Sequence, residues 1–158
     1  KGSYEKILEN GDFVTMDFGC ICQGYHADMT RTIAIGKTSS IQQEVYEVVR
    51  EAQQRALEKV RPGVIGADID KIARDFIREK GYGEYFGHGL GHGVGLEIHE
   101  IPYLRQQTCY TLVPGQIITV EPGIYIPGWG GVRIEDTVLV TENGYENLCT
   151  STKTLLSL

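Results

Sequence analysis

Two segments far apart in the chain resemble each other, and this internal repeat constrains the fold more than any other feature. GDFVTMDFG at residues 11–19 aligns with GQIITVEPG at residues 115–123. Further on, GYHADMT at residues 24–30 aligns with GVRIEDT at residues 131–137. Both alignments place one acidic residue over another. We interpret the two regions as a duplicated β-hairpin, with chance similarity between two short hairpins as the alternative.

Between the two copies the hydrophobic pattern is that of amphipathic helices. Apolar residues recur every three to four positions over residues 41–60 and again over residues 67–80. On either side the pattern changes to strands, which we expect at Phe13–Phe18, Ala27–Ile35, Gln116–Val120 and Val132–Val140. No linker or low-complexity run divides the sequence, so we expect residues 1–158 to form a single domain.

Charge and composition argue against several classes of function. The 158 residues carry 15 Lys and Arg against 21 Asp and Glu, a net charge of −6, without the basic stripe that nucleic acid or an anionic membrane attracts. No apolar run approaches the roughly 18 residues of a membrane span. Four cysteines without a CxxC pair are typical of reduced thiols in a cytosolic protein. We therefore expect a cytoplasmic protein with neither nucleic acid nor membrane as partner.

Four carboxylates occupy matched positions in the repeat, namely Asp17, Asp28, Glu121 and Glu135. Each lies in an otherwise apolar strand, where burial of an unpaired charge is costly. Exposure on the outer face of the sheet would explain any one of them better than it explains four at matched positions. Carboxylate oxygens on separate strands suit Mn²⁺, Mg²⁺, Co²⁺ or a carboxylate-rich Zn²⁺ site. The pattern predicts a two-metal site, provided that an imidazole lies close.

The segment FGHGLGHGVGLEIHEIP at residues 86–102 supplies three histidines, His88, His92 and His99. It lacks the spacing of a G-x-G-x-x-G phosphate loop and of an H-E-x-x-H helix, which excludes a dinucleotide site and a helical zincin site. Three histidines among five glycines indicate instead the wall of an active site, where the backbone approaches closely. His26 stands apart from them and is interpreted as structural.

Five separated motifs together resemble the pita-bread metallopeptidases, the superfamily of Xaa-Pro dipeptidase, aminopeptidase P and methionyl aminopeptidase. They are MDFG at 16–19, DMTRT at 28–32, HGLGHGVGLEIHE at 88–100, VEPGIY at 120–125 and GVRIEDT at 131–137. Their order agrees with the family over about residues 11–148. The resemblance implies an α+β pita-bread fold, in which a curved antiparallel sheet carries helices on its outer face.

The resemblance also implies a set of metal ligands. Five positions match the family's ligands, which are Asp17, Asp28, His92, Glu121 and Glu135. By this match Asp28 and Glu135 bridge two divalent ions. His92 and Glu121 hold one ion, Asp17 holds the other, and Glu121 is the proton acceptor. We expect Mn²⁺, with Co²⁺ and Zn²⁺ as alternatives.

Three further residues match catalytic positions of the family. His99 matches the histidine that contacts the substrate carbonyl, and His88 is typical of the proline-specific branch. Arg133 matches an arginine that orders the site, with a structural ion pair as the alternative. The implied function is hydrolysis of the bond that precedes proline, by an Xaa-Pro dipeptidase or aminopeptidase that acts on proline-containing peptides as a homodimer.

Three other functions are alternatives to hydrolysis before proline. The first is a catalytically silent module that binds peptides or partners, the second is methionyl aminopeptidase-like activity, and the third is creatinase-like hydrolysis of a non-peptide amide. Retention of all five ligand positions disfavours the silent module and the creatinase-like enzyme. His88 and Arg133 favour proline specificity over removal of methionine.

The resemblance further implies that this sequence holds only part of the family's catalytic domain. Two helical segments precede the second hairpin, whereas ten residues precede the first. The family's upstream histidine, which assists the leaving amine, has no match here. We therefore expect residues 1–158 to be the C-terminal part of a larger catalytic domain, incomplete on its N-terminal side and poorly active alone.

Overall fold

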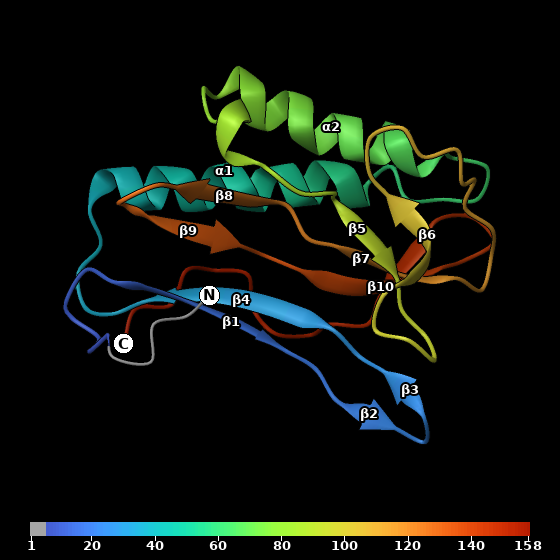
Figure 1. Ribbon diagram of the computed structural model, residues 1–158, viewed down its shortest axis with the longest axis horizontal. Helices are drawn as coiled ribbons and strands as arrows, with labels where there is room; N and C mark the ends of the chain where they lie inside the picture. Colours follow the sequence, from blue (N-terminus) through green and yellow to red (C-terminus); the bar gives the residue numbers. More distant parts are fainter. Residues whose placement is uncertain (1–5) are drawn as a thin grey trace.

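The computed structural model of the protein describes residues 6–158 and has strands at both ends of this range with helices between them, as predicted (Figure 1). The helices are α1 (Ser40–Leu57), α2 (Gly66–Glu79) and the short 3₁₀ helix η1 (Gly83–Tyr85). The strands before them are β1 (Phe13–Phe18), β2 (Ile21–Cys22), β3 (Tyr25–His26) and β4 (Met29–Ala34). The strands after them are β5 (Gly91–Gly93), β6 (Glu100–Leu104), β7 (Ile117–Val120), β8 (Gly123–Ile126), β9 (Gly130–Arg133), β10 (Asp136–Val140) and β11 (Tyr145–Asn147).

Two long antiparallel hairpins form the frame of the fold, and both are interrupted half-way. In the first hairpin β1 pairs with β4, and beyond a short break β2 pairs with β3. In the second, β7 pairs with β10, and beyond a break β8 pairs with β9. The repeat found in the sequence is therefore a repeat of this interrupted hairpin. The breaks fall at residues 19–20, 27–28, 121–122 and 134–135.

The break in the second hairpin corrects one prediction. The sequence predicts one strand over Val132–Val140, whereas the structure divides it at residues 134–135. Pro122 stands opposite this break, and proline has no N–H to donate to a neighbouring strand. The N–H of Glu135 instead donates to the carbonyl of Thr30 at 3.0 Å, forming an isolated bridge between β4 and the second hairpin. The main chain of Glu135, which is not paired within its own hairpin, therefore links the second hairpin to the first.

The histidine-rich segment belongs to the same sheet as β7 and β10 of the second hairpin. The strand order is β11-β10-β7-β5-β6, with β5 between β7 and β6. Glycine is required on β5 because a Cβ at Gly91 would lie 2.0 Å from the carbonyl oxygen of Thr119, and one at Gly93 would lie 2.4 Å from that of Ile101. These glycines let the backbone carrying His92 pack directly against both neighbours.

The helices begin and end close to the predicted positions. Ser39 caps α1, since its hydroxyl accepts from the N–H of Gln42 at 3.3 Å and its own N–H donates to the Gln42 side chain at 2.9 Å. The prediction that this helix runs to residue 60 is wrong by three residues. The N–H groups of Lys59 and Val60 bond to carbonyls three residues back, so the chain tightens into a turn ahead of Pro62.

The two hairpins differ in how they are covered. Helices α1 and α2 pack on each other and lie on the side of the second hairpin, while the first hairpin lies at the edge away from α2 (Figure 1). Buried side chains from α1, α2, β7 and β10 share one core, including Val49, Ala52, Ile69, Ala73, Ile118 and Val138. No helix between residues 6 and 158 combines the length and apolar character that a membrane span requires.

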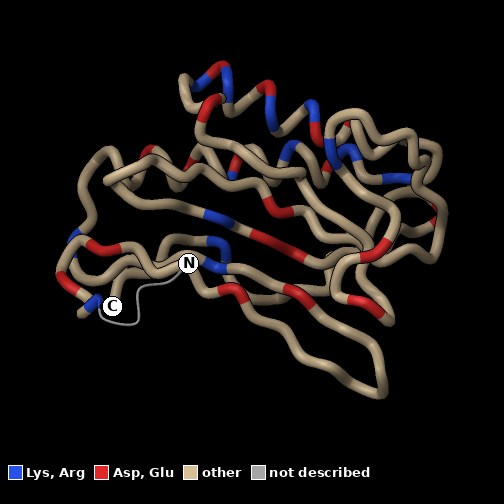
Figure 2. The backbone as a smooth tube through the Cα atoms, in the orientation of Figure 1, with Lys and Arg blue, Asp and Glu red and all other residues tan. Residues whose placement is uncertain are grey.

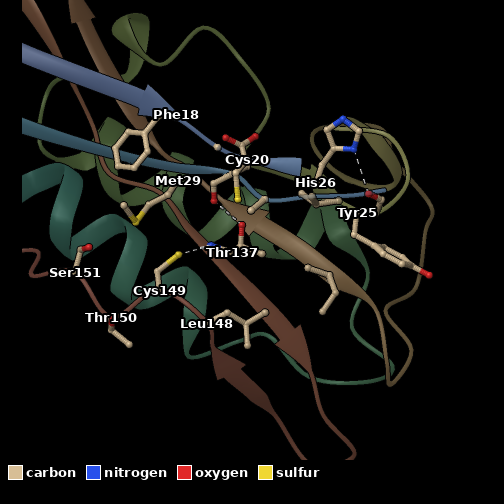
Figure 3. A pocket seen from close by; sticks show the side chains of 16 residues that line it. Phe18, Cys20, Tyr25, His26, Met29, Thr137, Leu148, Cys149, Thr150 and Ser151 are labelled. Carbon is tan, nitrogen blue, oxygen red and sulfur yellow. Dashed lines mark hydrogen bonds between the residues drawn. The ribbon is translucent and has the colours of Figure 1, made fainter. Parts of the chain in front are cut away.

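The first hairpin leaves apolar side chains exposed. Phe18, Ile21 and Tyr25 are 52%, 66% and 62% exposed. An apolar cavity of about 640 Å³ opens beside this hairpin, where Phe18 and Met29 face the C-terminal segment around Cys149 (Figure 3). Successive strand residues point to opposite faces, so Phe18 points away from the face of β1 that carries Asp17.

Candidate metal centre

The structure brings together all five residues that the sequence predicts as metal ligands. One group of ligand atoms, all within 4.8 Å of one another, comes from His92, Glu121 and Glu135, and a second comes from Asp17, Asp28 and Glu135. Asp28, Glu121 and Glu135 stand at the hairpin breaks. Acidic positions on both hairpins lie near the centre of the molecule in Figure 2. The five residues therefore come from both hairpins and from β5.

Glu135 is the residue shared by these two groups. It is 2% exposed, and its Oε1 is the one buried side-chain nitrogen or oxygen between residues 6 and 158 without a hydrogen-bond partner. Burial, and then the nearby charge of Glu121, raise the pKa of Glu135 to about 8. A divalent cation would satisfy the free oxygen and remove the repulsion, so the donor set fits a metal.

His92 is oriented to offer one nitrogen to this cluster. Its Nδ1 lies 3.0 Å from the carbonyl oxygen of Gly93, which can only accept, so the Nδ1 proton points there. Nε2 then faces the acids, 3.2 Å from Glu121 and 3.8 Å from Asp28. Burial lowers the pKa of His92, but its hydrogen bonds to Glu121 and to the Gly93 carbonyl, together with the charges of Glu121 and Asp28, outweigh burial, so the net pKa is raised. A main-chain acceptor on the second nitrogen is typical of metal-binding histidines.

The two aspartates of the first hairpin differ in burial. The side chain of Asp28 is 12% exposed, and burial followed by the charge of Asp17 raises its pKa. Asp17, by contrast, has a side chain that is 56% exposed. Its carboxylate forms an ion pair with the guanidinium of Arg133, which lies on the second hairpin.

Arg133 and His88 are joined through a residue that sequence reasoning missed, Tyr125. Arg133 Nη1 donates to the Tyr125 hydroxyl at 2.8 Å. That hydroxyl lies 3.1 Å from Nε2 of His88, whose Nδ1 lies 2.8 Å from the Gly89 carbonyl oxygen. Because that carbonyl can only accept, Nδ1 carries the proton and Tyr125 donates to Nε2. A hydrogen-bond chain therefore runs from Asp17 through Arg133 and Tyr125 to His88.

An open cavity of about 380 Å³ lies over the cluster. Its walls come from both hairpins and from the histidine-rich segment, and include Asp17, His88, His92, His99, Glu121 and Arg133. The ring of His99 lies 4.2 Å from that of His92, centroid to centroid, so His99 borders both the cavity and the acids. His26 lines the apolar cavity on the other side instead, and its Nδ1 lies 3.4 Å from the carbonyl oxygen of Gly95.

A salt bridge from α2 also holds the histidine-rich segment in place, and the sequence gives no sign of it. Asp70 and Arg74 pair on the buried side of α2, where the Asp70 carboxylate is fully buried. Arg74 then donates to the carbonyl oxygens of Phe86 and His88 at 2.8 and 2.7 Å. An amphipathic pattern would place Arg74 on the solvated face of this helix, but its side chain is largely buried and its hydrogen bonds bind the loop that carries His88.

Comparison with known proteins places the chain in a family. The family model of metallopeptidase family M24 matches residues 2–142, nearly the whole sequence. The chain belongs to this family. The resemblance predicted from five motifs is thus confirmed, and divalent metals are implied by the family.

Relatives and solved structures of M24 enzymes agree with this placement. A curated Xaa-Pro dipeptidase from Pyrococcus furiosus is 53% identical over 152 residues, which are 96% of this chain and 44% of that protein. The solved structure of an Xaa-Pro dipeptidase from Bacillus anthracis superposes with a TM-score of 0.95 at 54% identity, over 98% of this chain and 43% of that one. An X-Pro aminopeptidase from Thermotoga maritima gives a TM-score of 0.95 at 46% identity, over 99% and 44%.

The pita-bread fold predicted from the sequence is confirmed by these superpositions. The chain also spans less than half the length of the relatives it matches.

Proposed function

We propose that this chain is part of the catalytic domain of a two-metal peptidase that hydrolyses the peptide bond before proline. The observation that carries the proposal is the position of Glu135, whose carboxylate belongs to two ligand groups and keeps one buried oxygen without a partner. A single carboxylate shared by two groups is what a bridged pair of ions requires.

The ligand assignment combines these two groups with a third, formed by Asp28, His92 and His99, which brings Asp28 to the His92 side as well. His92 and Glu121 would hold one ion, Asp17 would hold the other, and Asp28 and Glu135 would bridge them. Oxygen-rich coordination with one imidazole suits Mn²⁺, and also Co²⁺ or Zn²⁺. Bound divalent ions supply Lewis-acid activation of water and of the peptide carbonyl.

The chain's own residues supply proton transfer and orientation. Glu121 faces the open cavity and would accept the proton of the attacking water. His99 borders the same cavity and would donate a hydrogen bond to the substrate carbonyl, where negative charge develops. Arg133 holds Asp17 by an ion pair and Tyr125 by a hydrogen bond, which fixes one wall of the site.

Proline specificity is supported by the relatives and by His88. The relatives named above are an Xaa-Pro dipeptidase in two cases and an X-Pro aminopeptidase in the third. His88 lines the same cavity and is held by Tyr125, so its ring has a fixed place in the wall that a substrate would contact. We infer that this chain belongs to the proline-specific group, and that proline-containing peptides are its substrates.

Metal-dependent cleavage by the complete protein that contains this chain tests the proposal. After removal of metal and addition of Mn²⁺, Ala-Pro or Ala-Pro-Pro should be cleaved faster than Met-Ala. Preference for Ala-Pro indicates a dipeptidase, and preference for Ala-Pro-Pro indicates an aminopeptidase. Faster release of Met from Met-Ala would contradict proline specificity. Equal activity with and without metal would contradict the metal mechanism.

The variant His99→Ala separates binding from chemistry in the same assay. In the wild type, a ring nitrogen of His99 lies in a group of possible ligand atoms with Asp28 and His92, so a ligand role for His99 is the competing assignment. We expect full metal content with kcat lowered about 10²–10³-fold, the usual cost of losing an oxyanion donor. Loss of metal would make His99 a ligand, and unchanged kcat would remove it from the reaction.

The isolated 158-residue chain should self-associate and show little peptidase activity. Phe18, Ile21 and Tyr25 expose apolar surface on the first hairpin, and such patches associate in water. The missing match to the family's leaving-group histidine should cost about 10²–10⁴-fold in rate. Light scattering and an Ala-Pro assay with Mn²⁺ measure both. A monodisperse monomer as active as the complete protein would contradict this expectation.

A further inference from the structure

Two fully buried threonines stand behind the two glutamates of the cluster. Thr30 lies on β4 of the first hairpin and Thr119 on β7 of the second, and both side chains are 0% exposed. Each hydroxyl contacts the carboxylate of one glutamate. The same arrangement therefore occurs twice, on residues from different hairpins.

Thr30 connects Arg133 to Glu135. Nε of Arg133 lies 3.2 Å from the Thr30 hydroxyl oxygen, and a guanidinium can only donate. The hydroxyl oxygen accepts there, so its own proton is free to point at Glu135 Oε2, which lies 2.6 Å away. With Oε2 held in this way, the rotation of the carboxylate is fixed, and the unpartnered Oε1 is directed into the cluster.

Thr119 is placed against Glu121 in the same way, between a fixed donor and the carboxylate. The main-chain N–H of His92 donates to the Thr119 hydroxyl oxygen at 3.0 Å. Because a main-chain N–H can only donate, the hydroxyl proton is directed at Glu121 Oε1, 3.3 Å away. Thr119 thus ties the carboxylate of one predicted ligand to the backbone of another.

We propose that Thr30 and Thr119 are positioning residues that set the orientation of the Glu135 and Glu121 carboxylates for metal binding. The inference rests on the metal site of the proposed function. Neither threonine would touch the metal or the substrate. Each hydroxyl acts because its oxygen is occupied by a fixed donor, which leaves its proton only the carboxylate as acceptor. Removal of such outer partners typically weakens metal binding about 10–100-fold.

Thr137 provides a matched control within the same fold. It aligns with Thr30 in the internal repeat and is 7% exposed. Its hydroxyl donates to the main-chain carbonyl oxygen of Asp28 at 2.6 Å, rather than to a carboxylate. Thr137→Val therefore removes a buried hydroxyl and its hydrogen bond without releasing the side chain of a ligand.

The test is metal titration of the complete protein in its metal-free form. Thr30→Val and Thr119→Val keep the shape of the side chain and remove the hydroxyl, while Thr30→Ser and Thr119→Ser restore the hydroxyl. Calorimetric titration with Mn²⁺ gives the affinity and the number of ions, and the absorption of bound Co²⁺ reports the geometry of the ligands. Thermal unfolding of the metal-free variants measures any structural effect separately.

We expect each Val variant to bind Mn²⁺ about 10–100-fold more weakly and to change the Co²⁺ spectrum. Each Ser variant should recover the wild-type affinity, and Thr137→Val should keep it even if its unfolding temperature falls. Wild-type affinity in a Val variant would overturn the role of that threonine, as would a Ser variant as weak as its Val counterpart. If a Val variant does not fold, Thr→Ala at that position removes the same hydroxyl. Wild-type protein that binds no Mn²⁺ would refute the proposed function itself, whereas wild-type binding with unaffected variants refutes only the positioning role.

Discussion

Glu135 and Asp136 are neighbours in the chain, and both are buried, but their surroundings are opposite. Asp136 accepts hydrogen bonds from Arg31 at 2.7 Å, from Lys153 and Asn147 at 2.8 Å, and from Gln53 at 3.1 Å. For Glu135, the only side chain among residues 6–158 that donates to its carboxylate is that of Thr30. One carboxylate is fully satisfied by the protein, and the other is not.

The pKa values of Glu135 and Asp136 move in opposite directions because the charges around the two carboxyl groups differ. Burial raises the pKa of both carboxyl groups, and for Glu135 the charge of Glu121 raises it further, to about 8. For Asp136 the hydrogen bonds and charges of Lys153 and Arg31 outweigh burial, so its pKa is lowered. A buried carboxylate paired by fixed cations is structural, whereas one left among other acids is a candidate for binding a mobile cation.

The two surroundings are connected through Arg31. Its guanidinium uses all five N–H donors, on the Asp136 carboxylate and on main-chain carbonyls of Thr30, Glu135, Ser151 and Thr152. The Asp136 pair therefore anchors the backbone that carries Glu135. We infer that the cost of burying the Glu135 carboxyl group with one oxygen unpartnered is tolerated because this framework is rigid.

The largest effect is expected at the second bridging position. Asp28→Ala should abolish binding of both ions, because this carboxylate lies in ligand groups with Asp17 and Glu135 and with His92. The loss should exceed the roughly 100-fold that changes behind the ligands reach. Metal analysis of the purified complete protein checks this. Two tightly held ions per chain in Asp28→Ala would contradict the bridging assignment.

The next largest effect is a difference in stability between variants of Asp136 and Glu135. Asp136→Asn should lower the free energy of unfolding of the metal-free protein by about 3–5 kcal/mol, because it leaves the buried Arg31 charge without its partner. Glu135→Gln should instead leave stability unchanged or raise it, since it removes a buried carboxyl group whose ionised form the folded state disfavours. Chemical denaturation of both variants measures the difference. Equal destabilisation by the two changes would remove the distinction between them.

The pH dependence of stability should also differ between the two positions. Because folding raises the pKa of Glu135 from 4.5 to about 8, the metal-free folded state holds a proton that the unfolded state releases, and stability falls as pH rises through this window. The raised pKa of His92 acts in the same direction above its usual 6.5. The lowered pKa of Asp136 acts oppositely, as its contribution is lost when pH falls below 3.8.

Two conditions should reduce the loss of stability between pH 4.5 and 8. Glu135→Gln removes the titrating group, and saturating Mn²⁺ neutralises it. Asp136→Asn should leave the slope in this window and remove the loss on the acid side. Unfolding curves at a series of pH values measure all three. A wild-type slope retained in Glu135→Gln would assign the titration to another residue.

The smallest effect is expected from one donor of the Asp136 network. Asn147→Ala removes one of four side chains that donate to this carboxylate and leaves Arg31 and Lys153 in place. We expect a loss of about 1–2 kcal/mol in unfolding free energy, with Mn²⁺ affinity unchanged. Weakened metal binding in this variant would show that the loss of one Asp136 donor is transmitted to the metal ligands around Glu135.

Sequence patterns predicted elements whose partners lie nearby in the chain or follow a regular period. The predicted bounds of β1, Phe13–Phe18, agree with the structure, and α2 starts and ends within one residue of the prediction. The strand over Val132–Val140 was misjudged because its break depends on Pro122 and on Thr30, which lies in the other hairpin. Local periodicity carries no information about such a partner.

The site shows the same limit. The five ligand positions could be predicted because acid and imidazole types recur in motifs, and the structure brings all five together. Tyr125, Thr30 and Thr119 could not, because a hydroxyl has no characteristic spacing and its role depends on which atoms it meets in the folded protein. The repeat singles out Glu135, which aligns with Asp28, but the donors around Asp136 come from residues that no motif connects to it.

Metal titration of Glu135→Gln beside Asp136→Asn, each in the complete protein, tests the central claim most directly. With the wild type as reference, calorimetry should find two Mn²⁺ ions per chain in wild type and in folded Asp136→Asn. Glu135→Gln should fail to hold the pair, although its stability is intact. Two ions bound with wild-type affinity by Glu135→Gln would contradict the assignment of Glu135 as the shared ligand, and with it the account of this site.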